Sequence, residues 1–194
     1  MLSLSGLYRY PLKSGRGEAL QRSAVDGLGL HGDRRWMLVD ADNGRFITQR
    51  LLPQMSQLSA LYDARGGLTL SAPGREDLSV ALPDPEQDLR GVVVWRDSLR
   101  VPDAGDAAAA WLSDLLGKTC RLVQVPEGRT RQVDTAYAQP GDRVAFADGF
   151  PLLLIGQASL DDLSQRVGQP LSMLRFRPNL VVTGSEAYAE DGWK

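Results

Sequence analysis

Two backbone amides and an arginine that could bind an anion lie in the stretch of residues 148–179. Asp148-Gly149 is a turn sequence, and peptide N–H groups in such a turn can converge on a phosphate. Arg177 would add a charged donor, and Pro178 favours an extended conformation for it. The alternative interpretation is that Asp148-Gly149 is only a turn and that Arg177 is a solvated or ion-paired side chain. Spacing alone leaves both interpretations open.

A second cationic segment occupies residues 12–17. It combines Lys13, Arg16, the hydroxyl of Ser14 and two glycines, a composition typical of a flexible loop that could contact a phosphate. The GxxxxGK[ST] spacing of a P-loop is absent. The alternative is a basic hairpin tip exposed to water.

A third basic cluster, Asp33-Arg34-Arg35, opens a predicted strand over 33–39. Successive side chains of a strand point to opposite faces. Arg34 should therefore lie on the face of Trp36, and Arg35 on the other face. One arginine would then point into a cleft while its neighbour points to water.

Few residues of this chain suit nucleophilic or metal chemistry. Cys120 is the only cysteine and His31 the only histidine, so an intramolecular disulfide and a Cys/His zinc site are excluded. Polar and apolar residues alternate around Cys120, which favours a buried strand residue over a nucleophile. His31 lies in a glycine-rich turn and would be the sole imidazole for a Ser-His-Asp or Cys-His mechanism. We predict no catalytic residue and no metal ligand among these side chains.

The composition is that of an ordinary soluble protein, with 43% hydrophobic residues, 24% charged residues and a net charge of −2. This charge provides no overall attraction to nucleic acid or to an anionic membrane, so any anion site must be local. No apolar run approaches the ~20 residues that a membrane span needs, and the N-terminus lacks a signal-peptide pattern. We therefore expect a cytoplasmic protein with neither a nucleic acid nor a membrane as its partner.

Helical periodicity predicts two helices. The first covers 103–116 and ends at Gly117, where a C-terminal glycine belongs. Its predicted apolar face consists of Ala107, Ala110, Trp111 and Leu115. The second covers 159–167, with Ser159 as its N-cap and further amide donors in its first turn. Its predicted apolar face consists of Leu160, Leu163 and Val167.

Short strands between Gly, Pro and Asp turns make up most of the remaining chain. The predicted strands cover 3–10, 19–25, 33–39, 45–50, 60–63, 68–72, 79–82, 91–94, 95–101, 152–155 and 180–183. Asn43-Gly44 predicts a hairpin between the third and fourth of them. A spacing of about ten residues is typical of a barrel or a sandwich. The polar segment 126–143 is longer than a compact domain needs, so it is either a mobile functional loop or a domain junction.

Six motifs, in the order in which they occur, resemble those of one known family. They are Tyr10-Pro11-Leu12-Lys13-Ser14, Gly32-Asp33-Arg34-Arg35-Trp36, Phe46-Ile47-Thr48-Gln49-Arg50, Ala147-Asp148-Gly149-Phe150-Pro151, Gln157-Ala158-Ser159-Leu160 and Phe176-Arg177-Pro178-Asn179. They resemble the motifs of MOSC proteins with an N-terminal MOSC β-barrel domain, MOSC being named after the C-terminal domain of molybdenum-cofactor sulfurases. The group includes the mitochondrial amidoxime-reducing component and its bacterial YcbX-type relatives. Six ordered motifs are far more specific than any one of them.

The resemblance implies a molybdenum-cofactor protein that reduces N-hydroxylated compounds such as hydroxylaminopurines and amidoximes. Its matched motifs place Lys13, Ser14 and Arg34 at the pterin and its phosphate, the amides of Asp148 and Gly149 at the phosphate, and Arg177 and Asn179 on the other wall of the pterin. Phe150 stands where family members often carry a hydroxyl. Binding of pyridoxal phosphate, a small-molecule substrate and an electron-transfer protein partner are further properties that the resemblance implies.

In these relatives the cysteine that ligates molybdenum lies in a Cys-Ser-Arg-Cys-type motif beyond the position of Trp193-Lys194, and Cys120 does not match it. We therefore expect a C-terminally truncated member of the family that is inactive by itself. The expected fold is mixed α/β and β-rich, with an N-terminal β-barrel domain over 1–125, flanked by the helix 103–116, and an incomplete MOSC β-barrel domain over 126–194.

Two hypotheses for function follow. The first is a molybdenum-cofactor oxidoreductase, and it requires Lys13, Arg34 and Arg177 to share one cleft. The second is a non-catalytic β-barrel module that binds a sulfur- or cofactor-bearing partner, and it would be favoured if these cations pointed to separate faces. An RNA-binding barrel is disfavoured by the acidic charge balance.

Overall fold

The computed structural model describes residues 1–193 and shows a mixed α/β, strand-rich chain with two α-helices in that range. The helices are α1 (Asp106–Leu116) and α2 (Gln157–Val167). The strands are β1 (Ser3–Arg9), β2 (Glu18–Ala19), β3 (Val25–Asp26), β4 (Gly29–Leu30), β5 (Trp36–Asp40), β6 (Ser59–Tyr62), β7 (Leu68–Ser71), β8 (Leu78–Val80), β9 (Leu89–Val94), β10 (Asp97–Pro102), β11 (Cys120–Gln124), β12 (Arg131–Gln132), β13 (Arg143–Val144), β14 (Leu154–Gly156) and β15 (Leu180–Thr183). Short 3-10 turns are η1 (Pro53–Gln57), η2 (Glu127–Arg129), η3 (Met173–Arg175) and η4 (Ala189–Gly192).

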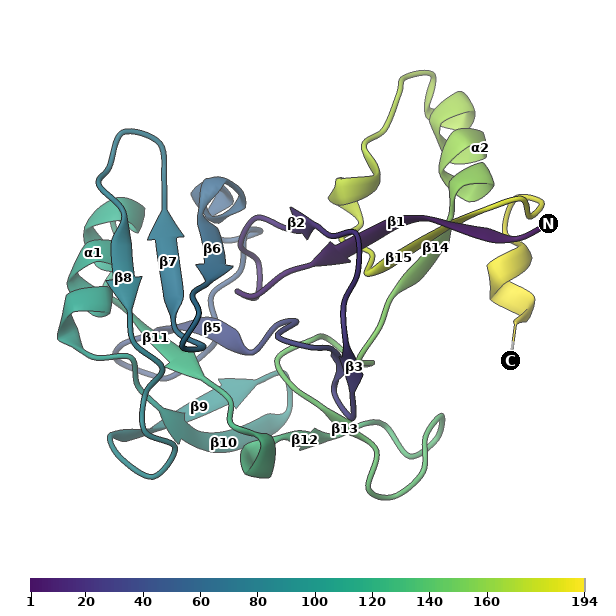
Figure 1. Ribbon diagram of the computed structural model, residues 1–194. Helices are drawn as coiled ribbons and strands as arrows, with labels where there is room; N and C mark the ends of the chain where they lie inside the picture. Colours follow the sequence, from purple (N-terminus) through teal and green to yellow (C-terminus); the bar gives the residue numbers. More distant parts are fainter. Residues whose placement is uncertain (194) are drawn as a thin grey trace.

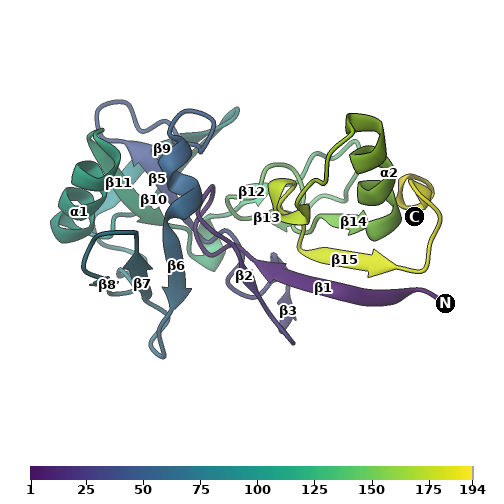
Figure 2. The ribbon, with the colours of Figure 1, turned by 90° about the horizontal axis from the view of Figure 1, so that it is seen from above.

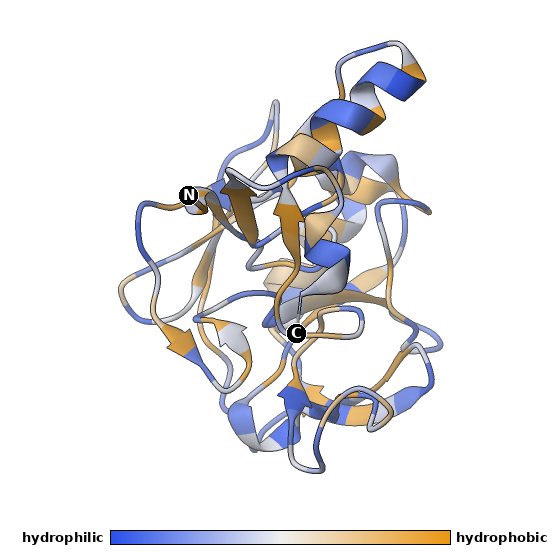
Figure 3. Cartoon of the chain, turned by 90° about the vertical axis from the view of Figure 1, so that its right-hand side faces the viewer, coloured by the Kyte–Doolittle hydropathy of each residue, from blue (hydrophilic) through white to orange (hydrophobic). Residues whose placement is uncertain are grey.

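These elements form two groups in space, as Figures 1 and 2 show. One group surrounds α1 and contains β5 to β11. The other, which we call the C-terminal sheet, has the strand order β14-β15-β1-β2 and carries α2. Apolar residues in Figure 3 lie mainly on strands, whereas the helices carry polar and apolar residues together. Among residues 1–193 the helices are all too short or too polar to cross a bilayer.

Strand β5 is buried on both faces and joins two apolar clusters. Trp36 and Leu38 belong to the cluster that packs on α1, and Met37 and Val39 belong to the cluster between β5 and the β9–β10 hairpin. The predicted alternation is therefore confirmed from Trp36 onward. Arg34 lies outside the strand because its φ is +48°, in the left-handed region, so its predicted place on the face of Trp36 is wrong.

The residues predicted to pair with this strand do so only in part. Over 45–50 the chain runs beside β5 through one isolated bridge, between Val39 and Phe46, while β11 is the antiparallel partner along the whole of β5. The reason is that the chain turns away after Ile47, whose amide still donates to the Leu38 carbonyl. The amides of Leu51 and Leu52 both donate to the carbonyl of Thr48. The predicted strand 19–25 is likewise confined to its two ends, β2 and β3.

Most other predicted strands are confirmed within a few residues, but the closed barrel is not observed. Within residues 1–193 the strands form separate sheets of two to four strands. Several strands have only two residues, as β2, β3, β4, β12 and β13 do, which is too few to continue hydrogen bonding around a barrel. The division of the chain near residue 125 stays a prediction.

Helix α1 confirms the first predicted helix and its glycine stop, but its buried face differs from the predicted one. Gly117 has the left-handed φ of +63° expected after a helix. The buried residues are Ala108, Ala109, Leu112 and Leu116, one position away from the predicted set. Trp111 lies at the edge of this face, since its indole N–H donates to the carbonyl of Glu76 at 3.0 Å.

The N-terminus of α2 is occupied by a carboxylate from a distant segment. Glu190 Oε1 accepts hydrogen bonds from the Gly156 amide at 2.8 Å and from the Ser159 hydroxyl at 2.6 Å. Gly156 permits this approach, because a Cβ there would lie 2.8 Å from Glu190 Oε2. The prediction that Ser159 is the N-cap is therefore wrong, because the helix begins at Gln157 and Gly156 is its N-cap. The role of the first-turn amides in an anion site stays a prediction. Leu160 is buried as predicted, whereas Val167 is exposed.

Replacement of Glu190 by Gln should lower the free energy of unfolding by about 0.5–2 kcal/mol, the usual contribution of a helix N-terminal cap. Burial disfavours the Glu190 carboxylate, but the hydrogen bonds from Ser159 and Gly156 outweigh it and lower its pKa. The stabilisation by Glu190 is therefore present above the ordinary pKa of Glu and is lost as the pH falls through the pKa of Glu190 in the folded protein.

Urea denaturation at neutral and acidic pH measures this stabilisation. The matched control is Glu186→Gln, an exposed residue whose replacement should change stability by less than about 0.5 kcal/mol. Equal effects of the two variants would contradict the capping role.

Cys120 is the first residue of β11 and is fully buried, as predicted. Burial raises the pKa of its thiol above the usual value. Its amide and carbonyl both contact the Ser113 hydroxyl, so the residue joins β11 to α1. This environment is that of a structural cysteine rather than a nucleophile.

Candidate functional site

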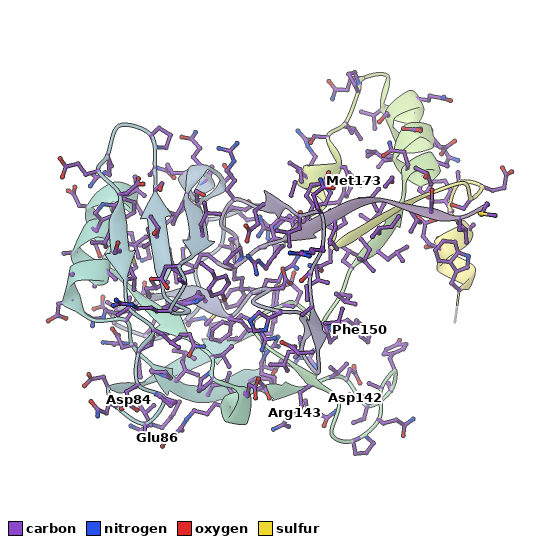
Figure 4. All side chains as sticks on the ribbon, in the orientation of Figure 1. Asp84, Glu86, Asp142, Arg143, Phe150 and Met173 are labelled. Atoms are coloured by element: carbon purple, nitrogen blue, oxygen red, sulfur yellow. The ribbon has the colours of Figure 1, made fainter. Side chains whose placement is uncertain are left out.

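One cavity of about 560 Å³ brings together all seven residues that the family resemblance placed at a cofactor. These are Lys13, Ser14, Arg34, Asp148, Gly149, Arg177 and Asn179. They come from the loop after β1, the residues before β5, the segment after β13 and the segment before β15. Phe150, which is labelled in Figure 4, also lines the cavity. Lys13, Arg34 and Arg177 therefore share one hollow rather than pointing to separate faces.

Lys13 is buried at 5% exposure and is not a hairpin tip. Its ammonium donates to the Phe146 carbonyl at 2.7 Å and to Asp148 Oδ1 at 2.5 Å. Burial lowers the pKa of Lys13, and the Asp148 carboxylate acts in the opposite direction. Burial also disfavours the Asp148 carboxylate, but Lys13 outweighs this and lowers the Asp148 pKa. Lys13 and Asp148 thus form an ion pair, in which the charge of Lys13 is already balanced.

Arg34 is held by three protein acceptors. Its Nη1 donates to Asp33 Oδ2 at 2.5 Å and to Asn179 Oδ1 at 3.0 Å, and its Nη2 donates to the Arg177 carbonyl at 2.8 Å. Asn179 is 1% exposed and also joins the backbone of Leu153 and Tyr8. Asn179 therefore fixes Arg34 at the cavity wall and has little remaining capacity for a ligand. Arg35 is buried against Asp26 at 2.7 Å, so the expectation that it points to water is wrong.

Arg177 is the least compensated cation of this group. Its Nη1 donates to the Gly15 carbonyl at 2.6 Å, while its Nη2 is buried without a hydrogen-bond partner within residues 1–193. Its Cζ lies 4.3 Å from the ring centroid of Tyr10. Burial, with a smaller contribution from Arg34, lowers the pKa of Arg177 to about 10. The predicted extended conformation is wrong, because φ is +58°, which allows the Arg177 carbonyl to meet Arg34.

Arg131 fixes the orientation of the peptide groups that contain the amides of Asp148 and Gly149. Arg131 is buried and donates to the carbonyls of Ala145, Ala147 and Asp148. In a trans peptide the carbonyl and the following N–H point in opposite directions, so the amides of Asp148 and Gly149 point away from Arg131. Neither amide donates to a protein acceptor within residues 1–193. Neither amide is therefore occupied by a described protein acceptor, and the predicted contact of both with a phosphate stays a prediction.

Apolar side chains form much of the remaining wall. Phe150, Leu152, Leu153 and Phe176 line the cavity and are at least 36% exposed. Phe150 packs edge-on against Tyr137 at 6.3 Å between ring centroids. Sequence reasoning missed Arg175, Leu152 and Leu153. It assigned no binding role to Arg50, Phe150 or Phe176, although all three lie within the quoted motifs.

Two family models match this chain. The MOSC N-terminal beta barrel domain matches residues 1–119, and the MOSC domain matches residues 141–194. The chain belongs to the MOSC family. The sequence-based assignment to this family is thus confirmed.

Several MOSC relatives align over nearly the whole chain. The mouse protein named mitochondrial amidoxime-reducing component 1 is 32% identical over 201 residues, which are 98% of this chain and 58% of that protein. The rice protein named molybdenum cofactor sulfurase is 30% identical over 211 residues, which are 100% of this chain and 26% of that protein. Among solved structures, a solution structure from Bordetella bronchiseptica gives a TM-score of 0.43 at 24% identity, over 56% of this chain and 92% of that one.

The cavity of this MOSC chain fits a flat heterocycle that carries a phosphate. Arg177 Nη2 and the two free amides are donors that a phosphate could satisfy, and the apolar wall suits a ring system. Cys120 is not among the lining residues. Among residues 1–193 there is no group of three or more His, Cys, Asp or Glu side chains that could hold a metal ion. The protein groups near the cavity thus match the organic part of the implied cofactor.

Proposed function

We propose that this MOSC protein binds the molybdenum cofactor in the cavity and that its full-length form reduces N-hydroxylated compounds. The observation that carries the proposal is the shared cavity of Lys13, Arg34 and Arg177, with one buried guanidinium nitrogen lacking a partner. The names of the mouse and rice relatives support the same chemistry. Because the chain spans 58% of the mouse protein, the activity is proposed for the whole protein and not for these residues alone.

Each residue at the cavity has a proposed role. Arg177 and the amides of Asp148 and Gly149 hold the phosphate, since they are the donors without protein acceptors. Arg34 contributes charge, and Asn179 keeps its guanidinium in place. The Ser14 hydroxyl lines the cavity and can donate to the same ligand. Phe150 and Phe176 cover the ring system and reduce its contact with water.

When bound, molybdenum would supply the two-electron chemistry that converts an N–OH group to N–H with uptake of two protons and release of water. The electrons must come from a donor outside this chain, and we propose an electron-transfer protein. A pyridoxal phosphate would need an available lysine, and Lys13 is already bound to Asp148, so this ligand is the less favoured one. The cytoplasm stays the predicted compartment.

Expression of the full-length gene product in a host that makes molybdenum cofactor tests the proposal. We expect purified protein with close to stoichiometric molybdenum by mass spectrometry and reduction of hydroxylaminopurine with an artificial electron donor. The control is the same protein from a host that cannot make the cofactor, which should contain no molybdenum and show no activity. Folded protein that lacks molybdenum in both hosts would refute the proposal.

The alternative function is a non-catalytic module that binds a sulfur- or cofactor-bearing partner. This function would be favoured if Lys13, Arg34 and Arg177 pointed to separate faces of the protein. Their common cavity disfavours it. A molybdenum-loaded protein without reductase activity on any N-hydroxylated compound would return support to this alternative.

A further inference from the structure

Arg50 and Arg175 are two cavity-lining arginines that the functions described above do not use. Both side chains line the cavity, and both residues are exposed. Within residues 1–193 neither guanidinium has a carboxylate within 4.0 Å or a hydrogen-bond partner. Arg50 belongs to the Phe46-Ile47-Thr48-Gln49-Arg50 motif, and Arg175 ends η3 two residues before Arg177.

Arg50 is held at the cavity by an aromatic side chain. Its Cζ lies 5.9 Å from the ring centroid of Trp95, whose indole N–H donates to Asp148 Oδ1 at 3.3 Å. Trp95 packs on Phe46 at 4.9 Å and has a φ of +56° in the turn between β9 and β10. A tryptophan in this region costs of order 1 kcal/mol, so the fold maintains an unfavourable turn that places its ring here.

The charges of the cavity fall into two tiers. In the inner tier, which consists of buried or half-buried cations, Lys13 is paired with Asp148 and Arg34 with Asp33. Within residues 1–193 Arg177 is the inner cation without a counter-charge. The outer tier consists of the exposed Arg50 and Arg175, which also lack a counter-charge in that range. A single phosphate held by Arg177 and the Asp148-Gly149 amides would leave both outer arginines unpaired. The cavity therefore carries more free positive charge than one phosphate needs.

We propose that Arg50 and Arg175 form an outer anion subsite, so that the cavity accepts a ligand with a second negative group beyond its inner phosphate. The ligand class is a diphosphate or another molecule with two linked anionic groups. Guanidinium groups without protein acceptors suit such a group because they can bind its oxygens in bidentate fashion. The proposal rests on the proposed function only for the position of the inner phosphate and does not involve molybdenum.

Binding of inorganic phosphate and inorganic pyrophosphate to the 194-residue chain tests the subsite. Calorimetry at low ionic strength is suitable, because salt screens exposed charges. We expect pyrophosphate to bind at least about tenfold more tightly than phosphate, which corresponds to about 1.4 kcal/mol. In the double variant Arg50→Gln/Arg175→Gln this preference should disappear, while the phosphate Kd should change by less than about twofold.

The matched control is Arg65→Gln, which removes an exposed arginine in the turn between β6 and β7, away from the cavity lining. It should leave both affinities unchanged. The proposal is overturned if wild type shows no preference for pyrophosphate, if neither anion binds, or if the double variant loses affinity for both anions equally. None of these results would bear on molybdenum content, so failure of the subsite and failure of the proposed function are separable.

Discussion

Replacement of Asp103 by Asn should lower the free energy of unfolding by about 1.5–3 kcal/mol, because it removes the buried carboxylate that two partly exposed arginines share. The Asp103 side chain is 5% exposed. Its Oδ1 accepts from Arg121 Nη2 at 2.6 Å and from the Gly105 amide at 2.8 Å, and its Oδ2 accepts from Arg90 and Arg121 at 2.7 and 2.8 Å. One carboxylate thereby connects β9, β11 and the start of α1.

Asparagine has nearly the same shape but directs an NH₂ group at two guanidinium donors. The variant therefore loses hydrogen bonds, leaves Arg90 without a counter-charge and leaves Arg121 with only the exposed Asp106. Urea denaturation at neutral pH measures the loss. The matched control is Asp106→Asn, since Asp106 also binds Arg121, at 2.7 Å, but has a 97% exposed side chain. Its replacement should cost less than about 1 kcal/mol, and similar losses in both variants would contradict a role for burial.

The effect of Asp103→Asn should also depend on pH. Burial disfavours the Asp103 carboxylate, but hydrogen bonds from Arg121 and Arg90 outweigh it and lower its pKa. The stabilisation by Asp103 is thus fully present above the unfolded pKa of about 3.9 and is lost as the pH falls through the folded value. The gap in stability between wild type and variant should therefore narrow below about pH 4.

The strands and helices were predictable where turn residues mark their ends and where polar and apolar residues alternate clearly in the sequence. Turn residues separate β6, β7 and β8, and each alternates clearly enough to be located within a few residues. The buried face of α1 was missed because residues 107–110 are four alanines in succession, which give no contrast between faces. The large apolar side chain of Trp111 then led to the choice of a face that contains it. In the structure its indole N–H donates instead to the exposed carbonyl of Glu76.

The candidate site was predictable as a set of residues but not as a set of contacts. Lys13, Arg34 and Arg177 were identified from their motifs, and the structure places them in one cavity. Their partners lie far away in sequence, as in the pairing of Lys13 with Asp148, so no spacing rule could show which cation is already compensated. The same holds for Glu190, which reaches the start of α2 from 34 residues away.

Replacement of Arg177 by Gln should weaken the binding of inorganic phosphate about 10- to 100-fold, since a hydrogen bond to a charged group contributes about 1.5–3 kcal/mol. Among the residues that the structure describes, Arg177 has an unpaired Nη2 and no carboxylate within 4.0 Å. In wild type, phosphate should raise the unfolding temperature in proportion to the logarithm of its concentration above Kd. The variant should show little of this stabilisation, and a thermal-shift titration measures both.

Without phosphate, the same variant should keep its stability within about 1 kcal/mol of wild type. The lost hydrogen bond to Gly15 is offset by removal of a buried charge whose pKa burial and Arg34 lower to about 10. This combination separates a ligand-binding arginine from a structural one, because loss of a structural arginine would lower stability with and without phosphate. The matched control is Arg166→Gln on the exposed face of α2, whose side chain is 69% exposed and pairs with Asp162. It should leave the response to phosphate unchanged, and an equal loss of that response in both variants would show that overall charge, rather than Arg177 in its cavity, attracts the anion.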